Sequence, residues 1–382
     1  MGARRVRRAS RLKLLTTGWL AAGLVLAGVE LALRIAGEPP ATWLPERTQA
    51  PGYAHVGWHQ TPSQPVTDEN LTRWNTLWGL PPDPDPGTIN RYGMRDNELA
   101  DPKPPGQKRV LVIGDSSAWG SGCPMAERFS SRLEVDLNPP DGGTPETRGV
   151  EVMNAAVPGY SSYQALLSLE DLVDASVVPD GVVAYLMNSD FMHIEGGADG
   201  AYFETRLAAG GLAEGVERLA TFRWVRALIW RVDPPLHPSD EVRVTVPQFQ
   251  HNIERLVTAT RRIGAWLVLV LPPQPSDLTS PDRVDGYQIH SPADVDEAAT
   301  VALSRPPIPY PYRVATCVEA WKASVPVVDG PRIFIDEIRR SGPAEGANAL
   351  FVDGIHPSSR GHALLADALL PVVRERLAQS LP

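Results

Sequence analysis

The sequence predicts an α/β protein, a three-layer α/β/α sandwich around a mainly parallel five-stranded sheet. Two observations predict this fold class. From Arg109 onward, short apolar runs alternate with stretches whose apolar residues recur at helical spacing. Most of the runs also lack polar–apolar alternation, as expected for strands that helices cover on both faces. Together these features are typical of β-α-β units with crossover helices.

The elements follow one another in that order along the chain. Five apolar runs are predicted to be strands, at 110–113, 150–153, 182–186, 266–271 and 325–328. Helical spacing predicts helices at 129–137, 163–175 and 248–263. A last helix is expected after Ser359, and Pro371 is expected to kink or interrupt it.

Two stretches fit no β-α unit, and we interpret them as insertions at about 191–245 and 272–313. Each follows the C-terminal end of a predicted strand. In an open α/β sheet this is the edge at which ligands bind. The insertions are therefore expected to shape a substrate pocket.

The N-terminus has the charge pattern of a membrane-targeting segment. Residues 1–13 contain several arginines and a lysine, and the uncharged apolar stretch 14–29 follows. Basic residues before an apolar run keep the N-terminus in the cytoplasm, so the rest of the chain is expected beyond the membrane. The stretch is shorter than the roughly 20 residues that span a bilayer, so Glu30 and Arg34 should lie near the interface.

We therefore expect a cytoplasmic segment at 1–13 and an uncleaved single-pass anchor at 14–36, with a cleaved signal sequence as the alternative. Residues 37–106 are rich in Pro and Trp and are interpreted as a linker and collar. Residues 107–382 would then form the folded domain. The protein would belong to the inner membrane of a bacterium, with this domain on the extracytoplasmic, or periplasmic, side.

Composition excludes some partners and leaves other questions open. The formal net charge of -9 gives no basic face for nucleic acid. The sequence contains two cysteines, Cys123 and Cys317, without the spacing of a metal site. They could form a disulfide or remain two buried thiols. The oligomeric state is not determined by any pattern in the sequence.

The first candidate for chemistry is a serine. The first predicted strand runs into Gly114, Asp115 and Ser116. A serine placed directly after a strand lies at the ligand-binding edge of the sheet, where its hydroxyl can act as a nucleophile if a base is near. Gly-Asp-Ser also occurs in ordinary turns. Asp115 is expected to bond to the turn rather than to take part in chemistry.

The second candidate is Asp353 with His356, just before the last predicted helix. Histidine is the natural general base near neutral pH, and a carboxylate three residues earlier can accept its Nδ1 proton. The alternative is an ordinary loop at the start of a helix. His362 could form a metal site with His356, but no third ligand cluster is evident, and His193 is expected in a surface loop.

Together these blocks resemble the SGNH (GDSL) hydrolase family, of the bacterial membrane-tethered type, whose sandwich is flavodoxin-like. The family carries Gly-Asp-Ser after its first strand and Asp-x-x-His before its last helix. Its second block is a glycine after the second strand, which Gly159 matches. Its third block is Gly-x-Asn-Asp, of which Asn188 matches, while Leu186 and Ser189 replace the outer residues and Asp190 comes one residue late.

The resemblance implies a catalytic triad of Ser116, Asp353 and His356. It also implies an oxyanion hole formed by the backbone N–H groups of Ser116 and Gly159 and the side chain of Asn188. No metal and no organic cofactor are implied. The segment 90–96 resembles a lead-in of membrane-tethered members, and no catalytic role follows from it.

The resulting prediction is an extracytoplasmic serine esterase that forms an acyl-enzyme on Ser116. Its substrate would be an acylated glycan of the cell envelope or a small ester. An O-acyltransferase acting on an envelope polysaccharide would use the same residues and is the main alternative. A catalytically inactive glycan-binding scaffold is a further alternative, supported by the altered third block.

Overall fold

The computed structural model of the chain describes residues 22–37, 53–54, 57–58, 89–138, 149–192, 219–221, 224–225, 228, 242–279, 309–342 and 349–379. Two compact units are distinguished. One contains residues 1–49 and 203–237, and the other contains residues 50–202 and 238–382. We call the first the N-terminal unit and the second the sandwich unit.

The sandwich unit is built on a five-stranded sheet, in the order β4-β3-β5-β6-β7, in which every pairing is parallel. Its strands are β3 Lys108–Gly114, β4 Val150–Asn154, β5 Gly181–Tyr185, β6 Trp266–Leu271 and β7 Val327–Asp329. A short antiparallel pair, β1 Tyr53–Ala54 and β2 Gly57–Trp58, lies outside this sheet. The predicted fold class is confirmed.

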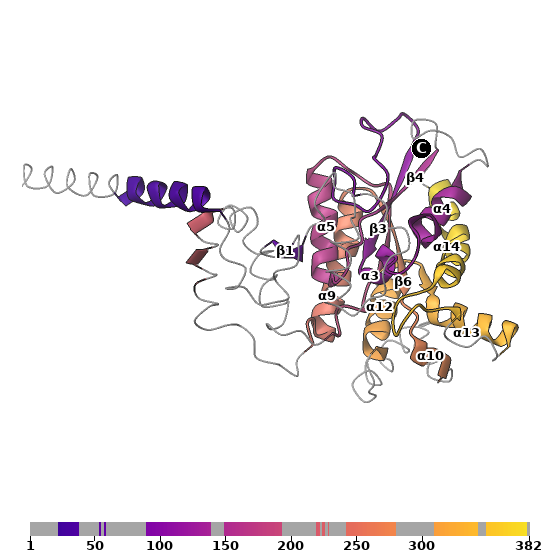
Figure 1. Cartoon of the computed structure of the whole chain (residues 1–382). Coiled ribbons are helices and arrows are strands. Elements are labelled where there is room, and N and C mark those ends of the chain that lie inside the picture. Colours follow the sequence, from indigo (N-terminus) through magenta and orange to yellow (C-terminus); the bar gives the residue numbers. More distant parts are fainter. Residues whose placement is uncertain are drawn as a thin grey trace, which may run out of the picture. The chain divides into compact units, whose positions relative to one another are not determined.

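Helices cover both faces of the sheet, which is why its strands are buried on both sides (Figure 1). One face carries α5 Ser162–Asp174, α9 Val246–Arg262 and α12 Tyr310–Ala323. The other carries α4 Phe129–Leu137, α13 Gly330–Ser341 and α14 Ser359–Gln379. The short elements α3 Ser116–Trp119, η3 Met125–Glu127 and α10 Pro275–Thr279 complete the unit.

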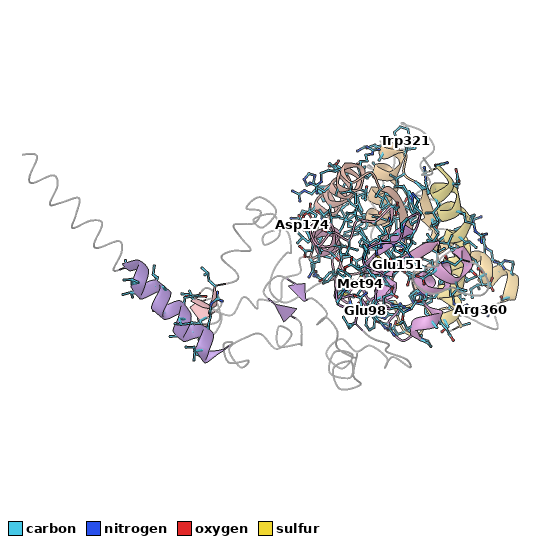
Figure 2. All side chains as sticks on the ribbon, turned by 90° about the horizontal axis from the view of Figure 1, so that it is seen from above. Met94, Glu98, Glu151, Asp174, Trp321 and Arg360 are labelled. Carbon is cyan, nitrogen blue, oxygen red and sulfur yellow. The ribbon has the colours of Figure 1, made fainter. Side chains whose placement is uncertain are left out.

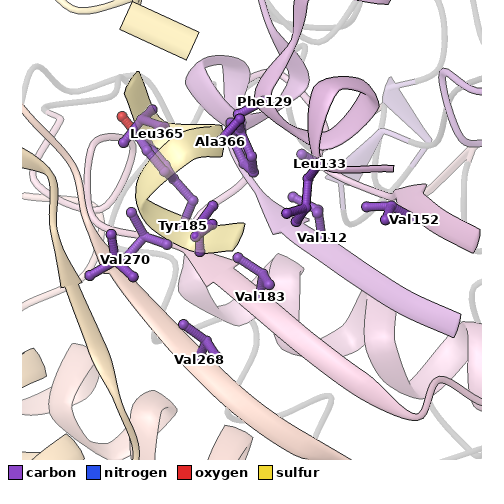
Figure 3. Packing of buried hydrophobic residues seen from close by; sticks show 14 of the residues in the cluster. Val112, Phe129, Leu133, Val152, Val183, Tyr185, Val268, Val270, Leu365 and Ala366 are labelled. Carbon is purple, nitrogen blue, oxygen red and sulfur yellow. The ribbon is translucent and has the colours of Figure 1, made fainter. Parts of the chain in front are cut away.

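The core between the sheet and α4 and α14 is apolar and closely packed (Figure 3). Phe129 and Leu133 of α4 and Leu365 of α14 face valines of the central strands, and all are less than 1% exposed. Burying each such side chain contributes about 1.5–3 kcal/mol. This packing fixes the positions from which α3 and the start of α14 reach the edge of the sheet.

Helix boundaries follow local signals. Ser161 and Gln164 form a capping box at the start of α5, and Thr245 and Gln248 form one at the start of α9. The predicted helix 129–137 is observed with these bounds. Of the two outcomes expected at Pro371, a kink or an interruption, the interruption is wrong, because α14 continues through this residue to Gln379.

The N-terminal unit contains a helix at 22–36 and helical residues between 220 and 228. Among the residues that the structure describes, no helix is both long enough and apolar enough to cross a bilayer. Most of the two predicted insertions, including His193, lies outside the described residues. The predicted domain boundaries stay predictions.

Candidate active site

Ser116 is held in a tight turn where β3 ends. A side chain on Gly114 would come within 2.4 Å of the Tyr185 carbonyl oxygen, so only glycine fits beside the neighbouring strand. Asp115 caps α3 by accepting the backbone N–H of Ser117 at 2.9 Å. Asp115 and Ser117 are buried, whereas Ser116 is partly exposed. The turn therefore presents the Ser116 hydroxyl, and Asp115 bonds to the turn as expected.

His356 lies between Ser116 and Asp353, within hydrogen-bond distance of both. Its Nε2 is 2.7 Å from Ser116 Oγ, and its Nδ1 is 2.6 Å from Asp353 Oδ2. The other oxygen of Asp353 accepts the backbone N–H groups of Ile355 and His356 at 2.8 and 2.7 Å. The structure thus brings together the three residues that the sequence selected, although Ser116 and His356 are 240 residues apart.

The charge on Asp353 determines how these groups share their protons. Partial burial acts to raise the pKa of the Asp353 carboxyl, but the hydrogen bonds and charge of His356 outweigh it and lower that pKa. An ionised carboxylate can only accept, so His356 Nδ1 donates to it. Nε2 then carries a lone pair and can accept the proton of the Ser116 hydroxyl. This is the arrangement that a general base requires.

Gly159 lies in the loop after β4, which is tied to the nucleophile turn by the hydrogen bond from Val157 N–H to Gly114 O at 3.1 Å. Its φ of 80° is in the left-handed region that favours glycine. The buried Arg243 donates from Nη1 to the Gly159 carbonyl at 2.6 Å. Neither Ser116 nor Gly159 uses its backbone N–H for a hydrogen bond to another described residue.

Asn188 lies in the turn after β5 and is 1% exposed. Its Nδ2 donates to Ser117 Oγ at 3.1 Å, which places the amide next to the nucleophile turn. Its Oδ1 accepts Gln274 Nε2 at 2.6 Å. Because Gln274 donates to Oδ1 of Asn188, the Nδ2 of Asn188 is directed toward the nucleophile turn. The preceding Met187 has φ 123°, a conformation rare for a side chain of this size.

Gln274 is held by its own set of contacts. Its backbone N–H donates to Asp277 Oδ2 at 2.6 Å, and Arg313 binds both oxygens of Asp277 at 2.7 Å. Arg313 also donates to the Pro272 carbonyl at 2.8 Å. Asp277 and Arg313 are both buried, so this bidentate pair fixes the chain after β6. The position of Asn188 therefore depends on residues of α10 and α12.

The altered third block has a structural explanation in Asp190. Its Oδ1 accepts both the backbone N–H and the hydroxyl of Ser162, at 2.9 and 2.5 Å. Ser162 opens α5, and its hydroxyl also accepts Asn252 Nδ2 at 2.8 Å. A carboxylate is favourable at this end of a helix. Asp190 thus joins the loop after β5 to the two helices α5 and α9.

No role for the lead-in was predicted from the sequence, but the structure packs it under the nucleophile turn. Arg95 is fully buried and donates to the carbonyls of Trp119, Gly120 and Cys123 at 3.2 to 3.3 Å. Its guanidinium also lies 4.1 Å from the centre of the Trp119 ring. These carbonyls include those at the end of α3, so Arg95 supports the helix that begins with Ser116.

The lead-in also contacts the edge strand of the sheet. Asp96 accepts the backbone N–H of Asn154 at 2.9 Å, and Ala100 donates to Glu151 at 3.3 Å. In Figure 2, Met94 and Glu98 are seen close to Glu151. No local pattern in the sequence signals this packing, because the burial of Arg95 depends on carbonyl partners from another part of the chain.

His362 lies in the core and is fully buried. Its Nδ1 accepts the backbone N–H of Phe129 at 3.3 Å, and its ring stacks on that of Phe129. Burial, together with the charges of Arg128 and Arg95, lowers the pKa of His362 to about 3. Within the described ranges, no three side chains of the metal-binding types are gathered into a candidate metal site. Both cysteines are free thiols.

Solved structures similar to this chain include hydrolases and esterases at low identity. They include LAE5, an α/β hydrolase from the metagenome of Lake Arreo in Spain, at 17% identity over 70% of this chain and 95% of that chain, with a TM-score of 0.39. TesA matches at 17% identity over 70% and 99%, with a TM-score of 0.39. Axe2, an acetylxylan esterase from Geobacillus stearothermophilus, matches at 17% identity over 70% and 95%, with a TM-score of 0.39.

No protein-family model matches the sequence, and no curated protein matches it. At this level of similarity the solved structures do not assign an activity. The functional conclusion below depends on the hydrogen-bonded side chains of the site.

Proposed function

We propose that this protein is a serine esterase that transfers an acyl group from an ester to Ser116 and then to water. The observation that carries the proposal is the chain of hydrogen bonds from Asp353 through His356 to Ser116, with distances of 2.6 and 2.7 Å. A serine, a base and a group that orients the base are what nucleophilic catalysis of acyl transfer requires.

In the first step His356 Nε2 takes the Ser116 proton while Oγ attacks the ester carbonyl. His356 then returns the proton to the leaving alcohol, and the acyl-enzyme remains. In the second step a water molecule loses a proton to His356 and attacks the acyl carbon. His356 then gives this proton to Ser116 Oγ as the bond between Oγ and the acyl carbon breaks, and the acid is released. Asp353 stabilises the protonated imidazole throughout.

The negative oxygen that forms in both steps needs hydrogen-bond donors. The backbone N–H groups of Ser116 and Gly159 and the Nδ2 of Asn188 are the groups that would supply them. Loss of one such donor typically costs about 10²- to 10³-fold in kcat. The held positions of the Gly159 and Asn188 loops support this assignment, since donors are effective when they are fixed before the reaction begins.

We further propose that the sandwich unit lies on the extracytoplasmic side of a bacterial inner membrane, anchored by the N-terminal helix. Support comes from the basic residues 1–13 and the apolar stretch after them. An acyl ester on a cell-envelope glycan, or a small ester, would then be the accessible substrate.

Hydrolysis of nitrophenyl esters by the full chain in detergent tests the esterase. Acetyl, butyryl and octanoyl esters would be compared for the wild-type protein, Ser116→Ala, and Ser341→Ala as a control serine on α13. Turnover that disappears only in Ser116→Ala is expected. Equal turnover in Ser116→Ala would refute the proposal, and turnover that requires an added carbohydrate acceptor would indicate the transferase instead.

A further inference from the structure

Part of the first insertion differs in character from the rest of this acidic chain. From Arg218 to Val232 the sequence contains four arginines and two tryptophans among apolar residues, and no acidic residue. We call residues 218–232 the basic segment. Basic, tryptophan-containing amphipathic helices are typical of segments that lie in the interface of a membrane.

The basic segment is hydrogen-bonded to the end of the N-terminal helix. The backbone N–H groups of Ala220 and Thr221 donate to the two oxygens of Glu30 at 2.9 Å each, and the Thr221 hydroxyl adds a bond of 2.8 Å. Further along, Trp224 Nε1 donates to the Gly37 carbonyl at 3.0 Å. These contacts lie at Glu30 and at Gly37, about two helical turns apart, a length of about 10 Å. In Figure 1 the described residues of the segment lie beside the C-terminal end of that helix.

These contacts also solve a problem that the sequence poses at Glu30. A carboxylate at the end of an apolar run is costly near hydrocarbon unless it is paired and hydrogen-bonded. Here Glu30 forms an ion pair with Arg34 at 2.7 Å and accepts the three bonds from the basic segment. Glu30 can therefore lie at the boundary of the hydrocarbon with its hydrogen bonds made by protein.

Both elements expose apolar side chains. Leu26 and Ile35 of the N-terminal helix are 64% and 79% exposed, and Val225 and Leu228 of the basic segment are each 50% exposed. The bonds to Glu30 and Gly37 place the segment at the depth where the apolar run of the helix ends. A bilayer that contains the helix would cover the apolar side chains of the segment and offer lipid phosphates to its arginines.

We propose that the basic segment is a membrane-interface element, held on the N-terminal helix by Glu30 and lying among the headgroups of an anionic phospholipid bilayer. The inference rests on the membrane anchoring proposed above and adds a second contact with the membrane, made by the first insertion. Tryptophan at this depth is typical of the interface, where its ring is apolar and its N–H polar.

Single-cysteine labelling of the full chain in vesicles of phosphatidylethanolamine and phosphatidylglycerol tests this proposal. In a background with Cys123→Ala and Cys317→Ala, an environment-sensitive fluorophore is placed at Val225→Cys, at Leu26→Cys in the helix, or at Val135→Cys. Val135 is 70% exposed on α4 of the sandwich unit and serves as the control. Lipids with a spin label near the headgroup quench a fluorophore that lies in the interface.

The Val225 label is expected to shift to shorter wavelength and to lose fluorescence with the quencher, while the Val135 label does neither. A Val225 label that behaves like the Val135 label, with Leu26 quenched, would overturn this inference and leave the anchor intact. If Leu26 is also not quenched, the proposed anchoring itself fails. Glu30→Gln is expected to reduce quenching at Val225 and not at Leu26, and unchanged quenching at Val225 would refute the role of Glu30.

Discussion

Asp353 accepts hydrogen bonds from the ring Nδ1 and the backbone N–H of His356, only three residues further along the chain. Asn188, by contrast, is oriented by Gln274, which is 86 residues away in the sequence. The acid–base loop is therefore organised by contacts within itself. The Asn188 loop instead needs β6, α10 and the Asp277–Arg313 pair in place. The difference indicates that the base is set by local structure and the oxyanion donor by the packed fold.

The largest effect is expected from a change in the locally organised acid–base loop. Asp353→Asn keeps the shape of the side chain but removes the carboxylate that fixes the tautomer of His356. We expect kcat to fall by about 10⁴-fold while the melting temperature changes little. Steady-state ester hydrolysis would be measured beside Asp336→Asn, an exposed aspartate on α13. Activity in Asp353→Asn near that of the control would show that Asp353 does not orient the base.

Asn188→Ala directly tests the oxyanion donor, which contacts between distant segments hold in place. Removal of one oxyanion donor should lower kcat by about 10²- to 10³-fold, with a smaller change in KM, because the donor acts mainly on the transition state. Asn97→Ala, an exposed asparagine in the lead-in, is the matched control. A change confined to KM would place Asn188 in substrate binding and not in stabilisation of the oxyanion.

Gln274→Leu sharpens the comparison, because it leaves every proposed catalytic group in place. Without Gln274 the Asn188 amide can rotate, and loss of one buried hydrogen bond suggests a fall in kcat of about 10-fold. Gln250→Leu removes a glutamine of α9 that donates to Glu319 of α12, and it controls for general destabilisation. Adding Gln274→Leu to Asn188→Ala should cost little more, and full additivity of the two losses would refute the coupling.

His362→Gln gives the smallest effect, on stability. Unfolded His362 binds a proton near pH 6.5, whereas the folded side chain stays neutral down to a pKa of about 3. Between these values the unfolded state binds more protons, so stability falls as pH falls, by about 0.7 kcal/mol from pH 7 to pH 6. Denaturant unfolding at the two pH values should show this loss in the wild type and less of it in His362→Gln. An unchanged difference would assign the pH dependence to other groups.

Pro371 illustrates where local rules fail. Proline in a helix costs about 3 kcal/mol, and this cost predicted a kink or an interruption. Leu365, Leu369 and Val373 on either side of it are fully buried, and each contributes about 1.5–3 kcal/mol. Pro371 itself is on the exposed side of α14. Packing of the buried side therefore outweighs the cost of the proline.

Helix α12 was not predicted, and its composition explains why. Its buried residues include Arg313, Thr316 and Glu319, so its sequence lacks a clearly apolar stripe. Arg313 is buried because Asp277 pairs with it, and that pairing exists only after β6 and α10 are folded. Periodicity detects a face that is buried by its own apolar side chains and misses one whose charges are paired from elsewhere.

The sequence by itself determined the layered fold and selected Ser116, Asp353 and His356. Strand runs, helical spacing and the turn residues around these positions are local properties, and parallel strands bring their carboxyl ends to one edge. The tertiary structure alone decided the partners of Asn188 and Gly159, the place of Arg95 under the nucleophile turn and the contact of Glu30 with the first insertion. These are buried polar contacts between distant segments, whose partners depend on side-chain directions that the packed core fixes and no local pattern encodes.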